Sequence, residues 1–394
     1  MKKILFFFPM NPNERDEGNK MRVYNLLKYF KTRNLQVDFV SIYNHYSKWL
    51  NSDLEAFKAT GLVNNIHLLY KKPKKTHLVN YVWQYKIPNL IYTKRQNAVK
   101  GTISDKTTFF FREQFDDILK DNSYDLVIIS YVEWAGLIKN NSYLKNAKTI
   151  IDTHDLISSQ SQYEKDFDLG KAFGEEIRRL NYFDEVWAIS SEEHYLFSQF
   201  CRNKVNFVTM MTDEPKIERH DKIFDIIYVA SSNQHNQKSS NWFFQQVYPL
   251  LSADLKICVI GKISQYIPKE TYKNVHLVEF ASDLNEYYAK SRIAICPMLS
   301  GTGIKVKVIE ALSHALPVVC TERGLDGLPN KSRNGCLASN NPEIFARHIF
   351  ELLNNESFYE EQRFFSREMF RQHFKTEICY ERLDHYLQLS EIIL

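Results

Sequence analysis

The sequence of 394 residues is short of glycine and lacks any organised set of cysteines. It contains 12 glycines, and its 6 cysteines form neither a C-x-x-C pair nor a spacing typical of metal ligands. This pattern argues against a metal site and predicts a reducing, cytosolic location. No apolar run is long enough to span a bilayer, and we find neither an internal repeat nor a low-complexity segment.

Excess charge of one sign is also missing, since the formal net charge is +4, which argues against nucleic-acid binding by the whole chain. One segment differs. Lys71–Lys106 contains nine basic residues and the single acid Asp105, with Tyr and Trp side chains interleaved. Three interpretations stay open: a solvated basic face, a peripheral contact with anionic membrane lipid, and a nucleic-acid site. The third has no accompanying motif, so we expect no nucleic-acid partner.

The chain opens with the pattern of a Rossmann-like unit. Ile4–Phe8 is too short for the apolar core of a signal peptide and is better interpreted as a buried strand. A polar loop over Asn11–Lys20, a helix over Met21–Arg33 and a strand over Leu35–Ile42 follow. This strand-loop-helix-strand order predicts the first part of a parallel sheet covered by helices.

Strands and helices alternate along the rest of the chain. Further strands are expected at 125–130, 149–152, 184–190, 224–230, 255–261 and 275–280. The polar stretch Met211–Lys222 is interpreted as a linker, and residues 341–394 have a helical pattern. We therefore predict an α/β protein with two Rossmann-like domains, residues 1–212 and 222–365, and a last helix over 366–394 that packs back on the first domain.

The most informative stretch is Ala294–Leu328, which has the pattern of strand, glycine loop, helix, strand and glycine turn. Gly301 and Gly303 let a loop backbone approach an anion closely. A helix is predicted from Ile304 to about Ala315, and its N-terminus would offer free N–H groups to a phosphate. Ser231–Ser240 is expected to be another polar loop, followed by a helix over 242–251.

Glu310 lies one turn after Lys307 in this predicted helix. A carboxylate behind a phosphate-binding loop is well placed to accept hydrogen bonds from a ribose diol. The alternative is a solvated surface pair of Glu310 and Lys307, which would stabilise the helix by about 0.2–0.5 kcal/mol. Spacing does not decide between the two interpretations.

The same stretch resembles the C-terminal signature of GT-B glycosyltransferases, most closely the retaining family 4 enzymes, or glycosyl transferases group 1. The matching residues are Gly301–Lys305 with Lys307, Glu310-Ala311, Pro317–Val319 with Thr321, and Gly324–Leu328. The resemblance implies two Rossmann-like domains facing a central cleft. It also implies that Glu310 holds the ribose. Thr302 stands where the family has the first Glu of its E-x7-E motif, and Ala230 and Ala315 stand where relatives often have Gly.

The resemblance also implies the site residues. Gly18 and Arg22 match the family's N-terminal glycine loop, and His154 matches the His of its D-x-H-D segment. His154 follows a buried strand, which by itself predicts a place at the ligand-binding edge of the sheet. The expected catalytic residues are His154 and Glu310. The expected donor-binding residues are Gly18, Arg22, Ser231, Ser232, Gly261, Lys262, Gly301, Thr302, Gly303, Ile304, Lys305 and Glu310.

We accordingly expect a glycosyltransferase that moves a sugar from a nucleotide diphosphate sugar to a hydroxyl of a glycan, lipid-linked glycan or protein. Bacterial surface polysaccharide or glycoconjugate synthesis is the expected context. The resemblance implies retention of anomeric configuration, no metal and no cofactor. The expected location is the cytoplasm, with the inner face of the cytoplasmic membrane as a further option. Two alternatives remain: a non-catalytic GT-B subunit that binds a glycan or partner enzyme, and a UDP-sugar epimerase.

Overall fold

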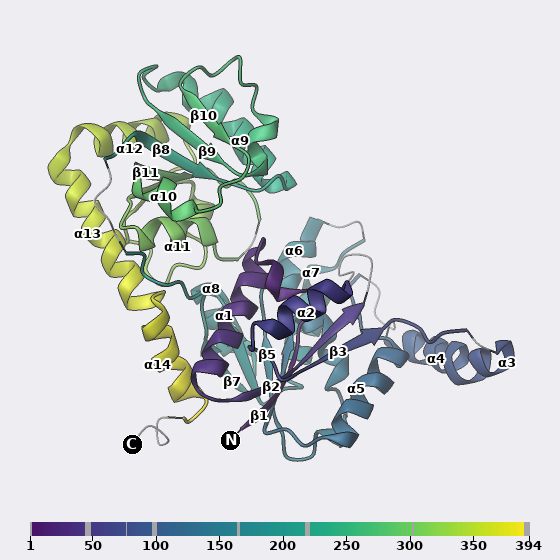
Figure 1. Ribbon diagram of the computed structural model, residues 1–394. Helices are drawn as coiled ribbons and strands as arrows, with labels where there is room; N and C mark the ends of the chain where they lie inside the picture. The colour runs from purple at the N-terminus through teal and green to yellow at the C-terminus, as the bar shows by residue number, and fades with distance from the viewer. Residues whose placement is uncertain are drawn as a thin grey trace. The chain divides into compact units, whose positions relative to one another are not determined.

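A computed structural model describes residues 2–43, 49–75, 77–96, 101–163, 166–216, 221–301 and 303–389. The chain divides into two compact units (Figure 1). The first contains Met1–Ile189 and Glu193–Phe207, and the second contains Ser190–Glu192 and Val208–Leu394. The predicted limits 1–212 and 222–365, and the packing of 366–394 on the first domain, stay predictions.

The first unit is built on a parallel sheet of seven strands in the order β3-β2-β1-β4-β5-β6-β7. Its central strands consist almost entirely of buried apolar residues, which is typical of parallel strands covered on both faces. The order reverses between β1 and β4, so ligands are expected at the carboxyl edge there. The strands are β1 Lys3–Phe7, β2 Gln36–Tyr43, β3 Asn65–Tyr70, β4 Leu126–Ser130, β5 Lys148–Asp152, β6 Glu185–Ala188 and β7 Lys204–Phe207.

Helices connect these strands as a parallel sheet requires. They are α1 Gly18–Thr32, α2 Asn51–Ala59, α3 Leu78–Tyr81, α4 Ile87–Gln96, α5 Phe109–Asp121, α6 Ile157–Gln160, α7 Leu169–Leu180 and α8 Ser191–Phe200. A π-helical turn, Val82–Lys86, joins α3 to α4. The expected loop over Asn11–Lys20 was too long, because α1 begins at Gly18. The amide of Met21 donates to Glu17 O at 3.0 Å, and Lys20 pairs with Asp16 at 2.8 Å, so the first turn forms three residues earlier.

The second unit has a parallel sheet of six strands in the order β10-β9-β8-β11-β12-β13. The predicted α/β fold with two Rossmann-like sheets is thus confirmed. The strands are β8 Phe224–Val229, β9 Ile257–Ile260, β10 Val275–Val278, β11 Ser291–Cys296, β12 Val318–Cys320 and β13 Cys336–Ala338. Cys258, Cys296 and Cys320 are buried core residues on these strands, and all six cysteines are free thiols.

The helices of this unit are α9 Gln234–Trp242, α10 Leu284–Ala289, α11 Val306–Ser313, α12 Pro342–Asn354, α13 Glu356–His373 and α14 Thr376–Tyr386. The expected loop over Ser231–Ser240 was wrong, because α9 begins at Gln234. The side chain of Asn233 accepts a hydrogen bond from Asn236 N at 2.9 Å and caps this helix. Conversely, α11 begins two residues later than predicted, because Lys305 is extended, with φ −93° and ψ 96°.

Residues 208–216 contact the junction of α13 and α14 within the second unit. Thr212 forms an isolated parallel bridge with Lys375, and Glu214 pairs with Arg371 and Lys375 at 2.6 and 3.2 Å. In the part of the chain that the structure describes, no helix is both long enough and apolar enough to cross a membrane.

Helix α13 packs directly on the loop before β13. Gly335 has φ +77°, and a Cβ there would lie 2.0 Å from Ser366 Oγ and 2.6 Å from Ser366 N and Cα. The Ser366 hydroxyl in turn donates to Leu316 O at 3.0 Å. Only glycine satisfies both the backbone conformation and this close approach.

Gly335→Ala should therefore lower the free energy of unfolding by roughly 2–4 kcal/mol, because backbone strain and overpacking add. Thermal unfolding followed by circular dichroism measures this. Gly174→Ala is the matched control. Gly174 lies in α7 with open space around its Cβ position, so alanine should stabilise that helix by up to about 1 kcal/mol. Equal, small effects of the two substitutions would contradict the proposed packing.

Candidate active site

The first unit gathers charged side chains at the carboxyl edge of its central strands. Arg22 of α1 reaches Asp152 at the end of β5, with Nη2 and Nε at 2.5 and 3.0 Å from Asp152 Oδ1. Both side chains are fully buried. His154 Nε2 lies 3.1 Å from Asp152 Oδ2, at ion-pair distance but without hydrogen-bond geometry. The structure thus brings predicted residues Arg22 and His154 together through one carboxylate that the sequence analysis did not single out.

The electrostatics of this cluster keep Asp152 ionised. Burial alone would raise the pKa of Asp152, but Arg22 and His154 beside it hold that pKa well below its usual range. Among the described residues, Arg22 Nη1 and His154 Nδ1 are buried atoms without a hydrogen-bond partner. Arg22 Nη1 is a hydrogen-bond donor and His154 Nδ1 is a donor or an acceptor, and a bound polar group would satisfy both.

Aromatic rings fix the position of His154. Its ring stacks on Tyr131, with centroids 4.4 Å apart, and on Phe8 at 5.6 Å. Tyr131 follows β4 and has φ +68° and ψ 128°, a conformation that side-chain-bearing residues rarely adopt. Its hydroxyl accepts a hydrogen bond from Asn19 Nδ2 at 2.7 Å. Gly18 is the first residue of α1 and directly precedes Asn19. Backbone strain of this kind concentrates at functional sites.

Asp152→Asn should destabilise the protein by about 3–5 kcal/mol, because it removes the charge that compensates the buried guanidinium of Arg22. Since the pKa of Asp152 is depressed, this stabilisation is present at neutral pH and is lost as the pH falls through the acidic range. Urea unfolding at pH 7 and at several pH values below the ordinary pKa of 3.8, where the loss is expected, measures both statements. Asp168→Asn, at an exposed helix cap that pairs with Lys171, should cost less than about 1 kcal/mol. A similar loss in both variants would refute the role of the buried pair.

In the second unit, the loop between β11 and α11 contains five of the predicted donor residues, at positions 301–305. Gly301 and Gly303 have φ +95° and +72°, so this loop needs glycine as predicted. Thr302 lies outside the described residues. The N-cap residue of α11, Lys305, makes no side-chain hydrogen bond to the first turn, so its side chain does not occupy the first amides of the helix. Ile304 packs against the turn at Gly327, where a Cβ would lie 2.6 Å from Ile304 Cβ.

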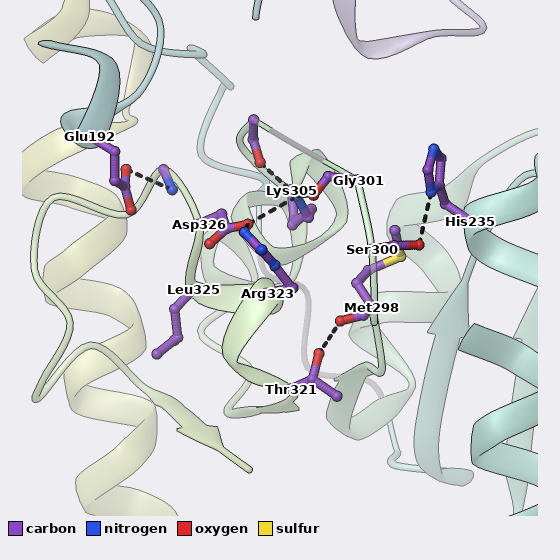
Figure 2. Close-up of polar contacts among 12 residues, drawn as sticks. Glu192, His235, Met298, Ser300, Gly301, Lys305, Thr321, Arg323, Leu325 and Asp326 are labelled. Carbon is purple, nitrogen blue, oxygen red and sulfur yellow. Dashed lines mark hydrogen bonds and ion pairs between the residues drawn. The ribbon is translucent and has the colours of Figure 1, made fainter. Parts of the chain in front are cut away.

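The side chain of Lys305 lies within this loop and contacts both the loop backbone and Asp326 (Figure 2). Its Nζ donates to Gly303 O at 2.7 Å and lies 3.7 Å from Asp326 Oδ2. Arg323 also pairs with Asp326, at 3.5 Å. The lysine is 7% exposed, so it shapes the loop and does not extend into solvent.

A polar network lies beside the loop. Lys307 Nζ donates to Asn236 Oδ1 at 2.9 Å, and Asn236 Nδ2 donates to Ser231 Oγ at 3.0 Å. His235 Nδ1 lies 2.9 Å from Ser300 Oγ (Figure 2). The network joins predicted Ser231 to Asn236, and His235 makes a separate contact with Ser300. Sequence reasoning placed neither Asn236 nor His235 in the donor site. The Asn-x-x-Asn cap of α9 is the signal that could have found them.

Glu310 and Lys307 have separate partners. The Tyr288 hydroxyl donates to Glu310 Oε2 at 3.2 Å, whereas Lys307 donates to Asn236. Burial raises the pKa of Glu310 to about 7, although Tyr288 and Lys307 act against this shift. Burial lowers the pKa of Lys307. A solvated surface pair, the alternative left open by the sequence, therefore does not describe these residues.

Three predicted donor residues lie at the ends of neighbouring strands. Gly261 follows β9, and its amide donates to Val278 O at 2.8 Å. Lys262 is exposed and begins a 3₁₀ turn. Ser232 follows Ser231 after β8, and its carbonyl accepts from Gln237 Nε2 at 2.6 Å.

The turn at 324–328 is held by Glu192, which accepts from Gly327 N at 3.0 Å (Figure 2). Over the described ranges, no three His, Cys, Asp or Glu side chains are grouped as metal ligands would be.

Two parallel Rossmann-like sheets and this arrangement of loops are the GT-B architecture. Residues 223–355 match the family model described as "Glycosyl transferases group 1". The similar solved structures confirm the predicted GT-B fold, and the match of residues 223–355 supports the predicted glycosyltransferase class.

Individual relatives are distant and match between 79 and 98% of this chain. A protein of Klebsiella pneumoniae, described as "Uncharacterized 44.6 kDa protein in cps region", is 21% identical over 348 residues, 79% of this chain and 87% of the relative. A mutant of S. aureus TarM in complex with fondaparinux, alpha-GlcNAc-glycerol and UDP is 14% identical, with a TM-score of 0.67, covering 98% of this chain and 99% of that chain. Anabaena HepE in complex with UDP and glucose is 11% identical, with a TM-score of 0.68 and coverages of 98% and 100%.

Glu310→Gln should stabilise the protein at pH 8 by about 1–3 kcal/mol and change stability little at pH 5. Folding raises the pKa of Glu310, so the folded state favours its protonated form. The resulting stabilisation of the fold is complete below the ordinary pKa near 4.5 and is lost as the pH rises through about 7. Glutamine removes the charge of this partly buried side chain and keeps an acceptor for Tyr288. Thermal unfolding between pH 5 and pH 8 measures the difference, and a constant difference across this range would contradict the shifted pKa.

Proposed function

We propose that this protein transfers a sugar from a UDP-sugar to a hydroxyl of a glycan, lipid-linked glycan or protein during synthesis of a bacterial surface polysaccharide or glycoconjugate. The observation that carries the proposal is the uncapped N-terminus of α11 behind the glycine loop, inside the stretch matched by the glycosyltransferase family model. UDP is chosen as the nucleotide because TarM and HepE were both solved with it. The cps-region relative supports the polysaccharide context.

In this proposal the diphosphate of the donor lies at the loop 301–305 and the start of α11. The departing UDP gains negative charge in the transition state, and fixed amides and a nearby cation stabilise it there more than in the ground state. Lys307 is the proposed cation, since Lys305 is already bound to Gly303 O and Asp326. A phosphate next to Lys307 would restore the charge that burial disfavours. These groups make a metal ion unnecessary, so the proposed enzyme needs none.

The ribose of UDP is proposed to bind Glu310, which lies one helical turn beyond Lys307 on α11. Two hydroxyl donors favour an ionised carboxylate, so binding would lower the raised pKa of Glu310. His154 is the proposed contact of the first unit with the reacting sugar, held by Tyr131 and Asp152. Retention of anomeric configuration is proposed from the resemblance to family 4, and the inner face of the cytoplasmic membrane is the proposed place of reaction.

UDP should raise the Tm of the protein far more than uridine at the same concentration, because the diphosphate makes the contacts at α11. Differential scanning fluorimetry with UDP and uridine measures this difference in Tm. The same measurement with GDP, ADP and dTDP identifies the nucleotide. Glu310→Ala should weaken UDP binding by roughly 1–3 kcal/mol, the usual loss for a charged hydrogen-bond partner.

Glu270→Ala is the control, since this residue is exposed and lies in the segment after β9. Equal stabilisation by uridine and UDP would refute the phosphate site, and an unchanged UDP affinity of Glu310→Ala would refute the ribose contact. Analysis of products separates the activities: a transferase consumes the donor only with an acceptor or water, whereas an epimerase changes the sugar and leaves the nucleotide sugar intact.

A further inference from the structure

The basic segment that the sequence analysis singled out forms a helical arm. Residues 78–96, the α3–α4 arm, are helical throughout, as α3, the π-helical turn and α4. Figure 1 shows α3 and α4 projecting from the first unit beyond α5. The arm attaches at the start of α5, where Tyr85 packs on Phe110 and Tyr92 packs on Phe109. Asn89 Oδ1 also accepts from Phe109 N at 3.2 Å.

The large apolar side chains of the arm are exposed to solvent and do not lie on the face that packs against α5. An ordinary surface helix buries its apolar stripe and exposes polar residues. Here the face that contacts α5 uses tyrosines and Asn89, whereas six large apolar side chains of the arm are exposed to solvent. These are Leu78, Val79, Trp83, Ile87, Leu90 and Ile91, which are 61, 67, 68, 37, 56 and 48% exposed. A continuous exposed patch of this kind marks an interaction surface.

The charge around this patch has one sign. Residues 56–104 contain no aspartate or glutamate, and the arm and the strand exit before it carry Lys71, Lys72, Lys74, Lys75, Lys86, Lys94 and Arg95. Within the described residues, none of these seven cations takes part in an ion pair. The patch thus combines apolar contact area with uncompensated positive charge.

We propose that the α3–α4 arm lies in the interface of an anionic lipid membrane, with its Trp83 face among the acyl chains and its lysines at the headgroups. A single helix that pairs an apolar face with Lys and Arg is suited to that interface, and each nearby cation adds attraction to anionic lipid. A second copy of the chain fits less well, since it would bring two sets of cations together without any acid. The inference adds the contact surface and the lipid charge to the proposed function, and it does not depend on the nucleotide site.

Co-sedimentation with phosphatidylcholine vesicles, with and without phosphatidylglycerol, tests this proposal on the full chain. We expect binding to the anionic vesicles that weakens as salt is added. The double variant Trp83→Ser/Leu90→Ser should bind roughly tenfold or more weakly, because it removes two apolar anchors. The double variant Lys86→Ala/Lys94→Ala should bind anionic vesicles roughly tenfold more weakly as well, whereas its binding to neutral vesicles should not change.

The matched control is Phe280→Ser/Phe350→Ser, which removes two apolar side chains of the second unit that are 84 and 65% exposed. It should bind vesicles as the wild type does. The stabilisation by UDP should be the same in all variants, so a failed nucleotide site and a failed membrane surface give different results. Equal binding to neutral and anionic vesicles, or arm variants that bind like the control, would overturn the proposal. So would a dimer in sedimentation velocity that the Trp83→Ser/Leu90→Ser variant abolishes.

Discussion

The structure depends on the burial of two parallel sheets on both faces. Strands such as β4 and β9 have no polar side to expose, so their polar neighbours lie where the strands end. All strands of one sheet run the same way, and their carboxyl ends therefore meet at one edge. Asp152, His154 and Tyr131 collect at that edge of the first sheet, and Ser231, Gly261 and Gly301 at that edge of the second. The positions of the candidate site residues follow from this single constraint.

The two sets of residues handle buried charge in opposite ways. In the first unit the ionised Asp152 is paired with the guanidinium of Arg22, so its buried charge is compensated within the protein. In the second unit the charges of Lys307 and Glu310 are opposed by burial, and each side chain has a neutral hydrogen-bond partner, Asn236 and Tyr288 respectively. The pKa of a group whose charged form is disfavoured by burial changes when a charged ligand binds beside it. The second unit therefore has the electrostatics of a site that binds a ligand, and the first has those of a preformed support.

Sequence patterns predicted the strands best, because long buried apolar runs have few alternative structures. Boundaries that depend on capping were less predictable. Gly18 looked like part of a loop, yet α1 begins there, and Asn233 caps a helix in a stretch rich in polar residues. The candidate site was predicted in part. Gly301, Gly303 and Glu310 lie in a local motif, whereas Asn19, Tyr131 and Asn236 come from separate elements and have no signature of their own.

The sequence by itself determined the alternation of strands and helices, the glycine loop before α11 and the basic character of residues 71–106, because each of these is a property of neighbouring residues. Only the tertiary structure decided which side chains contact one another. Arg22 and Asp152 are 130 residues apart in sequence, and Lys307 and Asn236 are 71 apart, so spacing along the chain carries no information about their contact. The outward apolar face of the arm was likewise decided by packing, since tyrosines and Asn89, and not the leucines and isoleucines, contact α5.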